Sequence, residues 1–166
     1  MFLTTVLLDG PTEPQAAREA ASFYIYPRAE VAPVVYDLAY SRAAGMPPAE
    51  VLTMLTQTTG QALDRAKSGD PAMVGPAYFG PMRLDEFIAT RVVEAVVHGI
   101  DLTDALDQPC HAGPAALART ADILDDLLAR CAVPGRPQDL REDDQAWVRA
   151  ATGRSEHPDP RLPLIR

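Results

Sequence analysis

Sixteen prolines divide this chain of 166 residues into pieces about as long as a helix. Proline is excluded from helix interiors because it has no amide proton and its ring clashes with the preceding turn. Within the pieces, apolar residues recur every three or four positions, which is the period of a helix with one buried face. First-turn prolines and terminal glycines mark several of the ends. The pattern predicts helices over residues 30–44, 47–69, 83–106, 114–132 and 143–151.

Long helices joined by short connections predict an all-α fold arranged as an antiparallel helical bundle. The length suits one compact domain over residues 1–166 and is too small for two ordinary domains. Residues 71–82 are rich in glycine and proline, so we expect a loop there. After the last helix we expect a short extended tail, in which residues 162–165 and Trp147 pack back on the body.

The charge of the chain narrows the classes of partner. A net charge of −8 with no basic cluster would repel phosphate backbones, which excludes nucleic acid. No run of about 18 apolar residues could span a membrane. The apolar opening MFLTTVLL has no basic residue before it and no cleavage site after it, so we expect a cytoplasmic protein. Cys110 and Cys131 would then be reduced thiols.

The helix expected over residues 83–106 carries polar groups where its apolar pattern predicts burial. On a helical wheel with Leu84 at the origin, Arg91 and His98 fall inside the apolar stripe and Glu94 falls at its edge. A buried charge needs a partner, so we expect these side chains to bind each other, another protein group or a ligand. The expected stripe consists of Leu84, Phe87, Ile88, Ala95, Leu102, Ala105 and Leu106.

Glu94 and His98 are four residues apart, which lets two side chains on one helix converge on one metal ion. Carboxylate oxygen and imidazole nitrogen suit zinc or another divalent first-row ion. Asp101 could then orient the imidazole ring by accepting a hydrogen bond from the ring nitrogen that does not bind the metal. Arg91 could contact an anionic substrate or neutralise the charge of Glu94. The spacing also fits a simpler interpretation, in which Arg91 and Glu94 form an ion pair and His98 is a hydrogen-bonded core histidine.

Two stretches, TRVVEAVVHGIDLTDAL and WVRAATGRSEHPDPRLPLI, resemble the mycothiol-dependent maleylpyruvate isomerase family of actinobacteria. The amino-terminal domain of that family is a DinB-like four-helix bundle. The resemblance implies a divalent ion, usually zinc, held by Glu94 and His98 together with a histidine from an early helix. It also implies that the metal activates the thiol of mycothiol, which adds to or is transferred onto an electrophilic substrate.

The chain departs from the family pattern at its start, where we expect the first helix of the bundle to be lacking. The histidines are His98, His111 and His157, and none lies in an early helix. His111 and His157 are weak substitutes, since His111 follows the helix and His157 is expected in an exposed loop. The third ligand could therefore lie upstream of Met1, come from a partner chain or be lost. A bundle lacking one helix would also favour a homodimer.

Two functions follow from these features. The first is a metal-dependent and mycothiol-dependent isomerase or thiol S-transferase-like enzyme, with Glu94 and His98 as metal ligands, Arg91 at the substrate or thiol, and Asp101 behind His98. Its partners would be a small-molecule thiol and an electrophilic substrate. The alternative is a non-catalytic helical-bundle binding or dimerisation module that has lost the complete metal site.

Overall fold

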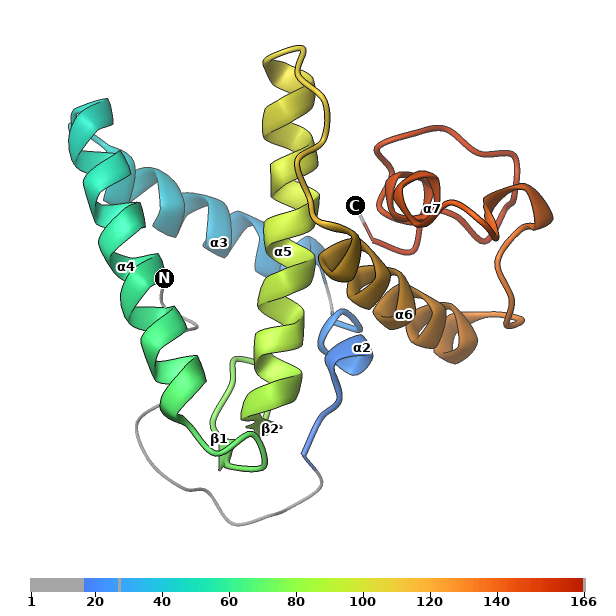
Figure 1. Ribbon diagram of the computed structural model, residues 1–166, viewed down its shortest axis with the longest axis horizontal. Helices are drawn as coiled ribbons and strands as arrows, with labels where there is room; N and C mark the ends of the chain where they lie inside the picture. Colours follow the sequence, from blue (N-terminus) through green and yellow to red (C-terminus); the bar gives the residue numbers. More distant parts are fainter. Residues whose placement is uncertain (1–16, 27, 166) are drawn as a thin grey trace. The chain divides into compact units, whose positions relative to one another are not determined.

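The computed structural model describes residues 17–26 and 28–165, and most of these residues are helical. The expected all-α class is confirmed, and the helix ends lie close to those predicted (Figure 1). None of the described helices combines the length and apolar character needed to cross a bilayer. The elements are α2 (Ala20–Phe23), α3 (Arg28–Ala43), α4 (Pro48–Ser68), β1 (Val74–Gly75), β2 (Met82–Arg83), α5 (Leu84–Ala105), α6 (Pro114–Cys131), the 3-10 helix η1 (Gln138–Leu140) and α7 (Asp144–Ala151).

The chain separates into two compact units. Unit 1 contains Ile25–Leu84, and unit 2 contains Arg18–Tyr24 together with Asp85–Arg166. Unit 1 holds α3, α4 and the two short strands, whereas unit 2 holds α2, nearly all of α5, and α6 and α7. The polar residues singled out on the sequence all belong to unit 2.

Unit 1 is built from two long helices and a small hairpin. The hairpin pairs Val74 with Arg83 and Gly75 with Met82 in antiparallel register, so the segment expected to be a loop contains two very short strands. The rings of Tyr26 and Phe79 stack at 4.6 Å beside it. Much of the apolar surface of α3 and α4 is exposed, with side chains of Val34, Val35, Tyr36, Leu38, Tyr40, Leu52, Leu55 and Leu63 among the exposed ones.

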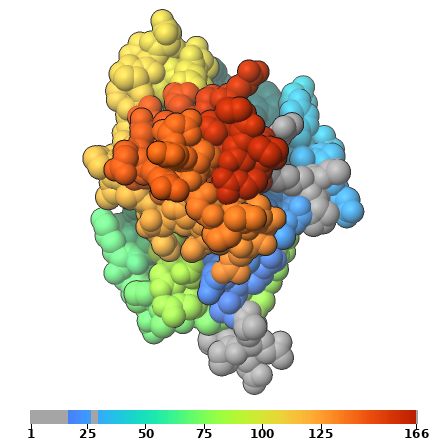
Figure 2. All heavy atoms as spheres, turned by 90° about the vertical axis from the view of Figure 1, so that its right-hand side faces the viewer, coloured from blue at the N-terminus to red at the C-terminus, as the bar shows by residue number. Residues whose placement is uncertain are grey.

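Unit 2 has a well-packed core centred on α6 and α7. Trp147 on α7 is fully buried, and its indole N–H donates to the carbonyl of Ala121 on α6 at 3.4 Å. The segment after α7 returns to it, because the amides of Leu164 and Ile165 both donate to the carbonyl of Ala151. Figure 2 shows this red segment against the orange surface of α6 and α7. Trp147 and Ile165 are buried, so the predicted packing of the tail is confirmed.

The segment before α3 is tied to α5 within unit 2. The amide of Ala20 donates to Oε2 of Glu86 at 2.7 Å, and the hydroxyl of Tyr24 donates to the carbonyl of Thr90 at 3.1 Å. Asp143 caps α7, since its side chain accepts the amide of Ala146. These bonds use polar groups that would otherwise lose water without gaining a partner.

The buried face of α5 differs from the predicted one in the second half of the helix. Leu84 and Phe87 are buried as expected. Beyond them the buried side runs through Val93, Val96, Val97 and Ile100, whereas Ala95, Leu102, Ala105 and Leu106 are exposed. The prediction was wrong because this helix is apolar on more than one side, and a wheel cannot tell which apolar side is buried.

Two substitutions on α5 test this face. Ile100 is fully buried and Leu102 is 61% exposed. We expect Ile100→Ala to lower the free energy of unfolding by about 2–5 kcal/mol, because it leaves a cavity. Leu102→Ala should change it by roughly 0.5 kcal/mol or less. Urea unfolding followed by the fluorescence of Trp147, the single tryptophan, measures both values. Equal losses would contradict the assigned face.

Candidate functional site

Glu94 and His98 meet on the outward side of α5. Oε2 of Glu94 lies 3.3 Å from Nε2 of His98, so the two side chains converge as their spacing predicted. The side chain of His98 is 68% exposed and that of Glu94 is 35% exposed. His98 is therefore not a core histidine, and the burial expected for it on the wheel is wrong. The pair is instead open to a ligand from solvent.

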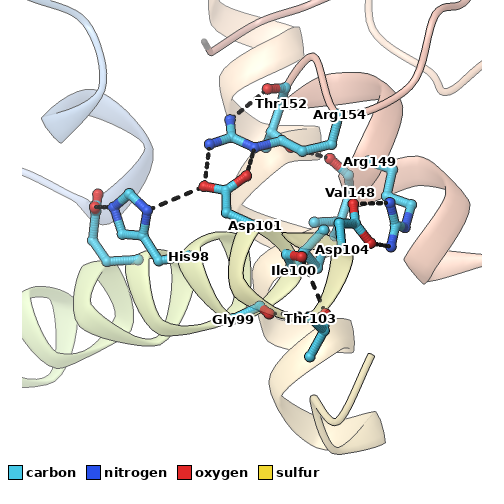
Figure 3. A network of polar contacts seen from close by, with 11 residues as sticks. His98, Gly99, Ile100, Asp101, Thr103, Asp104, Val148, Arg149, Thr152 and Arg154 are labelled. Atoms are coloured by element: carbon cyan, nitrogen blue, oxygen red, sulfur yellow. Dashed lines mark hydrogen bonds and ion pairs between the residues drawn. The ribbon is translucent and has the colours of Figure 1, made fainter. Parts of the chain in front are cut away.

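Asp101 occupies the other side of the imidazole ring. Its Oδ2 lies 3.2 Å from Nδ1 of His98, one turn further along α5 (Figure 3). His98 thus lies between two carboxylates, one at each ring nitrogen. This is the position predicted for Asp101 as a group that orients the ring.

Two arginines complete this network and were missed on the sequence. Arg154, which follows α7, donates to both carboxylate oxygens of Asp101 at 2.8 and 2.7 Å. Arg149 on α7 makes the same two-pronged contact with Asp104 at 2.8 and 2.6 Å. Arg154 and Asp101 are 53 residues apart in the chain, and no spacing rule relates positions so distant. Only the folded unit brings them together.

The guanidinium of Arg91 lies over two aromatic rings. Its guanidinium lies 5.3 Å from the ring centre of Phe23 and 5.2 Å from that of Phe87. Its Nε donates to Oγ1 of Thr90 at 3.1 Å, whereas its Nη2 is buried and has no hydrogen-bond partner among residues 17–26 and 28–165. The contacts among the described residues include no hydrogen bond or ion pair from Arg91 to Glu94. Within the described part of the chain, Arg91 therefore keeps one buried donor without a partner, and its charge acts on Glu94.

The neighbouring charges shift the ionisation of all three groups. Burial of the Glu94 carboxyl raises its pKa, but the hydrogen bond with His98 and the charge of Arg91 outweigh burial, so the net pKa is lowered. The hydrogen bond with Glu94, with help from Asp101, raises the pKa of His98 despite partial burial. The hydrogen bonds from Arg154 lower the pKa of Asp101. The site therefore favours two carboxylates around a proton-binding imidazole.

The donor atoms fit a divalent ion only in part. Carboxylate oxygen and imidazole nitrogen are suitable ligands, and the two converge. However, residues 17–26 and 28–165 contain no group of three or more His, Cys, Asp or Glu side chains that could hold a metal. A closed three-ligand site is thus absent from the described part of the chain.

The other two histidines do not join the pair. His157 was expected in an exposed loop, yet its side chain is only 10% exposed and lies 3.1 Å from Asp139. Its Nδ1 accepts the amide of Asp159, so both ring nitrogens are already used. His111 is exposed in the connection between α5 and α6. Neither residue acts as a substitute ligand in this fold.

The family model described as the mycothiol maleylpyruvate isomerase N-terminal domain matches residues 3–103. The chain belongs to this family. The matched region includes α3, α4 and α5 as far as Thr103, and with them Arg91, Glu94, His98 and Asp101. No curated protein and no solved structure matches the chain. Because the match ends at residue 103, Arg149 and Arg154 lie beyond the mycothiol maleylpyruvate isomerase N-terminal domain as the family model defines it.

In metal-free protein we expect the pKa of His98 to lie above the usual value for histidine. We expect Asp101→Asn to lower the pKa of His98, because the variant removes a carboxylate from Nδ1. Asp104→Asn is the matched control, since Asp104 pairs with Arg149 instead. Histidine NMR signals of EDTA-treated protein, assigned with His98→Ala, measure the shift across pH.

The raised pKa of His98 also sets the pH range in which this residue stabilises the fold. Because the pKa of His98 is higher in the folded state, its charge stabilises the fold below the unfolded pKa, and this contribution is lost as pH rises through the folded pKa. Asp101→Asn should reduce the contribution of charged His98 to the free energy of unfolding. A pKa of His98 that is equal in the wild type and Asp101→Asn would contradict the network.

Proposed function

We propose that this protein is a metal-dependent and mycothiol-dependent isomerase or thiol S-transferase-like enzyme acting on a small electrophile. The observation that carries the proposal is the convergence of Glu94 and His98 on the exposed side of α5, within the region matched by the family model. A reduced small thiol as cofactor agrees with the cytoplasmic location expected from the sequence.

Glu94 and His98 would supply two ligands to a divalent ion, with zinc as the first choice. Asp101 would hold the opposite nitrogen of His98, as outer carboxylates do in many metal sites. A bound zinc ion would lower the pKa of a coordinated thiol, so that the thiolate forms at neutral pH. The further ligands would come from solvent, the thiol or residues outside the described part of the chain.

Arg91 would bind an anionic group of the substrate or the thiol cofactor. Its Nη2 has no hydrogen-bond partner among the described residues, and a buried donor is costly to leave unpaired. Maleylpyruvate, named in the description of the family, carries carboxylates that a guanidinium binds well. Cation–π contacts with Phe23 and Phe87 would help to hold the guanidinium in place for such a contact.

The alternative function is a non-catalytic binding or dimerisation module. Two observations favour it: the described residues hold no three-ligand cluster, and α3 and α4 expose many apolar side chains. Exposed apolar surface of this kind often marks an interaction site. Metal binding and turnover separate the two functions.

Metal binding is the first test. We expect EDTA-treated protein to take up one equivalent of Zn²⁺ or Co²⁺, measured by calorimetry and elemental analysis. His98→Ala and Glu94→Gln should abolish this uptake because each removes a ligand. His111→Ala is the matched control, since His111 is exposed and away from the pair. Uptake that is absent in the wild type, or unchanged in His98→Ala, would reject the metal-dependent enzyme.

Turnover is the second test. With maleylpyruvate and mycothiol, we expect metal-loaded wild type to isomerise the substrate and Glu94→Gln to lose this activity. Glu50→Gln, an exposed carboxylate on α4, should retain it. Free thiol is measured in parallel, because isomerisation returns the thiol and S-transfer consumes it. Metal uptake without any thiol-dependent reaction would favour the binding module.

A further inference from the structure

Arg154, which is not one of the proposed metal ligands, is held in place by three hydrogen bonds. Two of its nitrogens donate to Asp101, and its Nη1 donates to the carbonyl of Thr152 at 2.6 Å. Thr152 is itself buried, and its hydroxyl donates to the carbonyl of Val148 in α7. The side chain of Arg154 is only 20% exposed. Its guanidinium therefore has a fixed position relative to the end of α7.

This anchoring fixes the carboxylate that faces His98. Oδ2 of Asp101 is shared between Nη2 of Arg154 at 2.7 Å and Nδ1 of His98 at 3.2 Å (Figure 3). The two-pronged contact sets the plane of the carboxylate, because a guanidinium binds both oxygens in one plane. An ionised carboxylate can only accept, so the contact with Asp101 favours a proton at Nδ1.

A neutral imidazole has one N–H and two carboxylate neighbours. Oε2 of Glu94, 3.3 Å from Nε2, would favour the opposite tautomer, with the proton at Nε2. Only the tautomer with the proton at Nδ1 leaves a lone pair at Nε2 for a ligand. The two carboxylates thus favour opposite tautomers of neutral His98, and the orientation of Asp101 affects how much of the tautomer with a free Nε2 lone pair is present.

We propose that Arg154 is a positioning residue that holds Asp101 against Nδ1 of His98 and so favours the neutral tautomer whose Nε2 carries the lone pair for a ligand. The inference rests on the proposed function in one respect, which is that Nε2 is the atom that binds metal. Arg154 lies beyond residue 103, so the segment after α7 contributes to a site whose other residues lie in the family domain.

The chain offers a matched control one turn along α5. Arg149 binds Asp104 through two hydrogen bonds of nearly the same length as those from Arg154 to Asp101. Among the described contacts, Asp104 has none with His98. Both arginines thus link α5 to the C-terminal part of unit 2, but only Arg154 acts on the imidazole.

The experiment compares Arg154→Met with Arg149→Met in metal-free protein. Long-range ¹H–¹⁵N NMR of the His98 ring, at a pH where the ring is neutral, reports which nitrogen carries the proton. We expect the proton at Nδ1 in the wild type and in Arg149→Met, and a shift towards Nε2 in Arg154→Met. Asp101→Ala is the positive control for the shift.

A second measurement is the affinity for Co²⁺. Loss of an outer partner of a metal-bound histidine typically weakens metal affinity by roughly 10–100-fold, and we expect this for Arg154→Met and not for Arg149→Met. If Arg154→Met unfolds at a lower temperature than Arg149→Met, Arg154→Lys replaces it. Lysine keeps the charge but cannot form the two-pronged contact, so it should also shift the tautomer.

The outcomes separate this inference from the proposed function. A proton at Nε2 in the wild type, or equal tautomers in Arg154→Met and the wild type, overturns the role of Arg154. An equal shift of the His98 tautomer in Arg149→Met also overturns the role of Arg154. The shift would then result from loosening any contact between α5 and the C-terminal part of unit 2. If the wild type binds no metal, the proposed function fails, while the NMR result still decides whether Arg154 positions the ring.

Discussion

The burial of Val93, Val97 and Ile100 on one side of α5 is the constraint on which the candidate site depends. These side chains are almost completely removed from water, and the favourable free energy of burying them fixes the rotation of the helix about its axis. Once that rotation is set, Glu94 and His98 must lie on the outward side. The location of the site thus follows from the apolar face opposite it.

The outward position also explains the chemistry that the site can support. A glutamate and a histidine at the rim keep access to solvent, so they avoid the large cost of buried charge and can still exchange a ligand. Each ring nitrogen of His98 faces a carboxylate, and two arginines on the C-terminal side neutralise Asp101 and Asp104. Along α5, each ionisable side chain of the network thus has a partner that can carry the opposite charge.

The family model ends at residue 103, but the candidate site also depends on the later region, which contains the second stretch that resembles the family. Both arginines come from this later region: Arg149 lies in the last turn of α7, and Arg154 lies just beyond the helix. They join α5 to the C-terminal segment through four short hydrogen bonds to two carboxylates. The region after residue 103 thus supplies residues that hold the carboxylates of the candidate site in place.

The sequence by itself determined the helices and the spacing that puts Glu94, His98 and Asp101 on successive turns of one helix, because these are local relations set by the helical period. The tertiary structure alone decided which apolar side of α5 is buried, that His98 is exposed, and that Arg154 reaches Asp101. The reason is physical: a helical period repeats along the chain and can be read from spacing, whereas burial and contacts between distant residues depend on the packing of other elements against the helix.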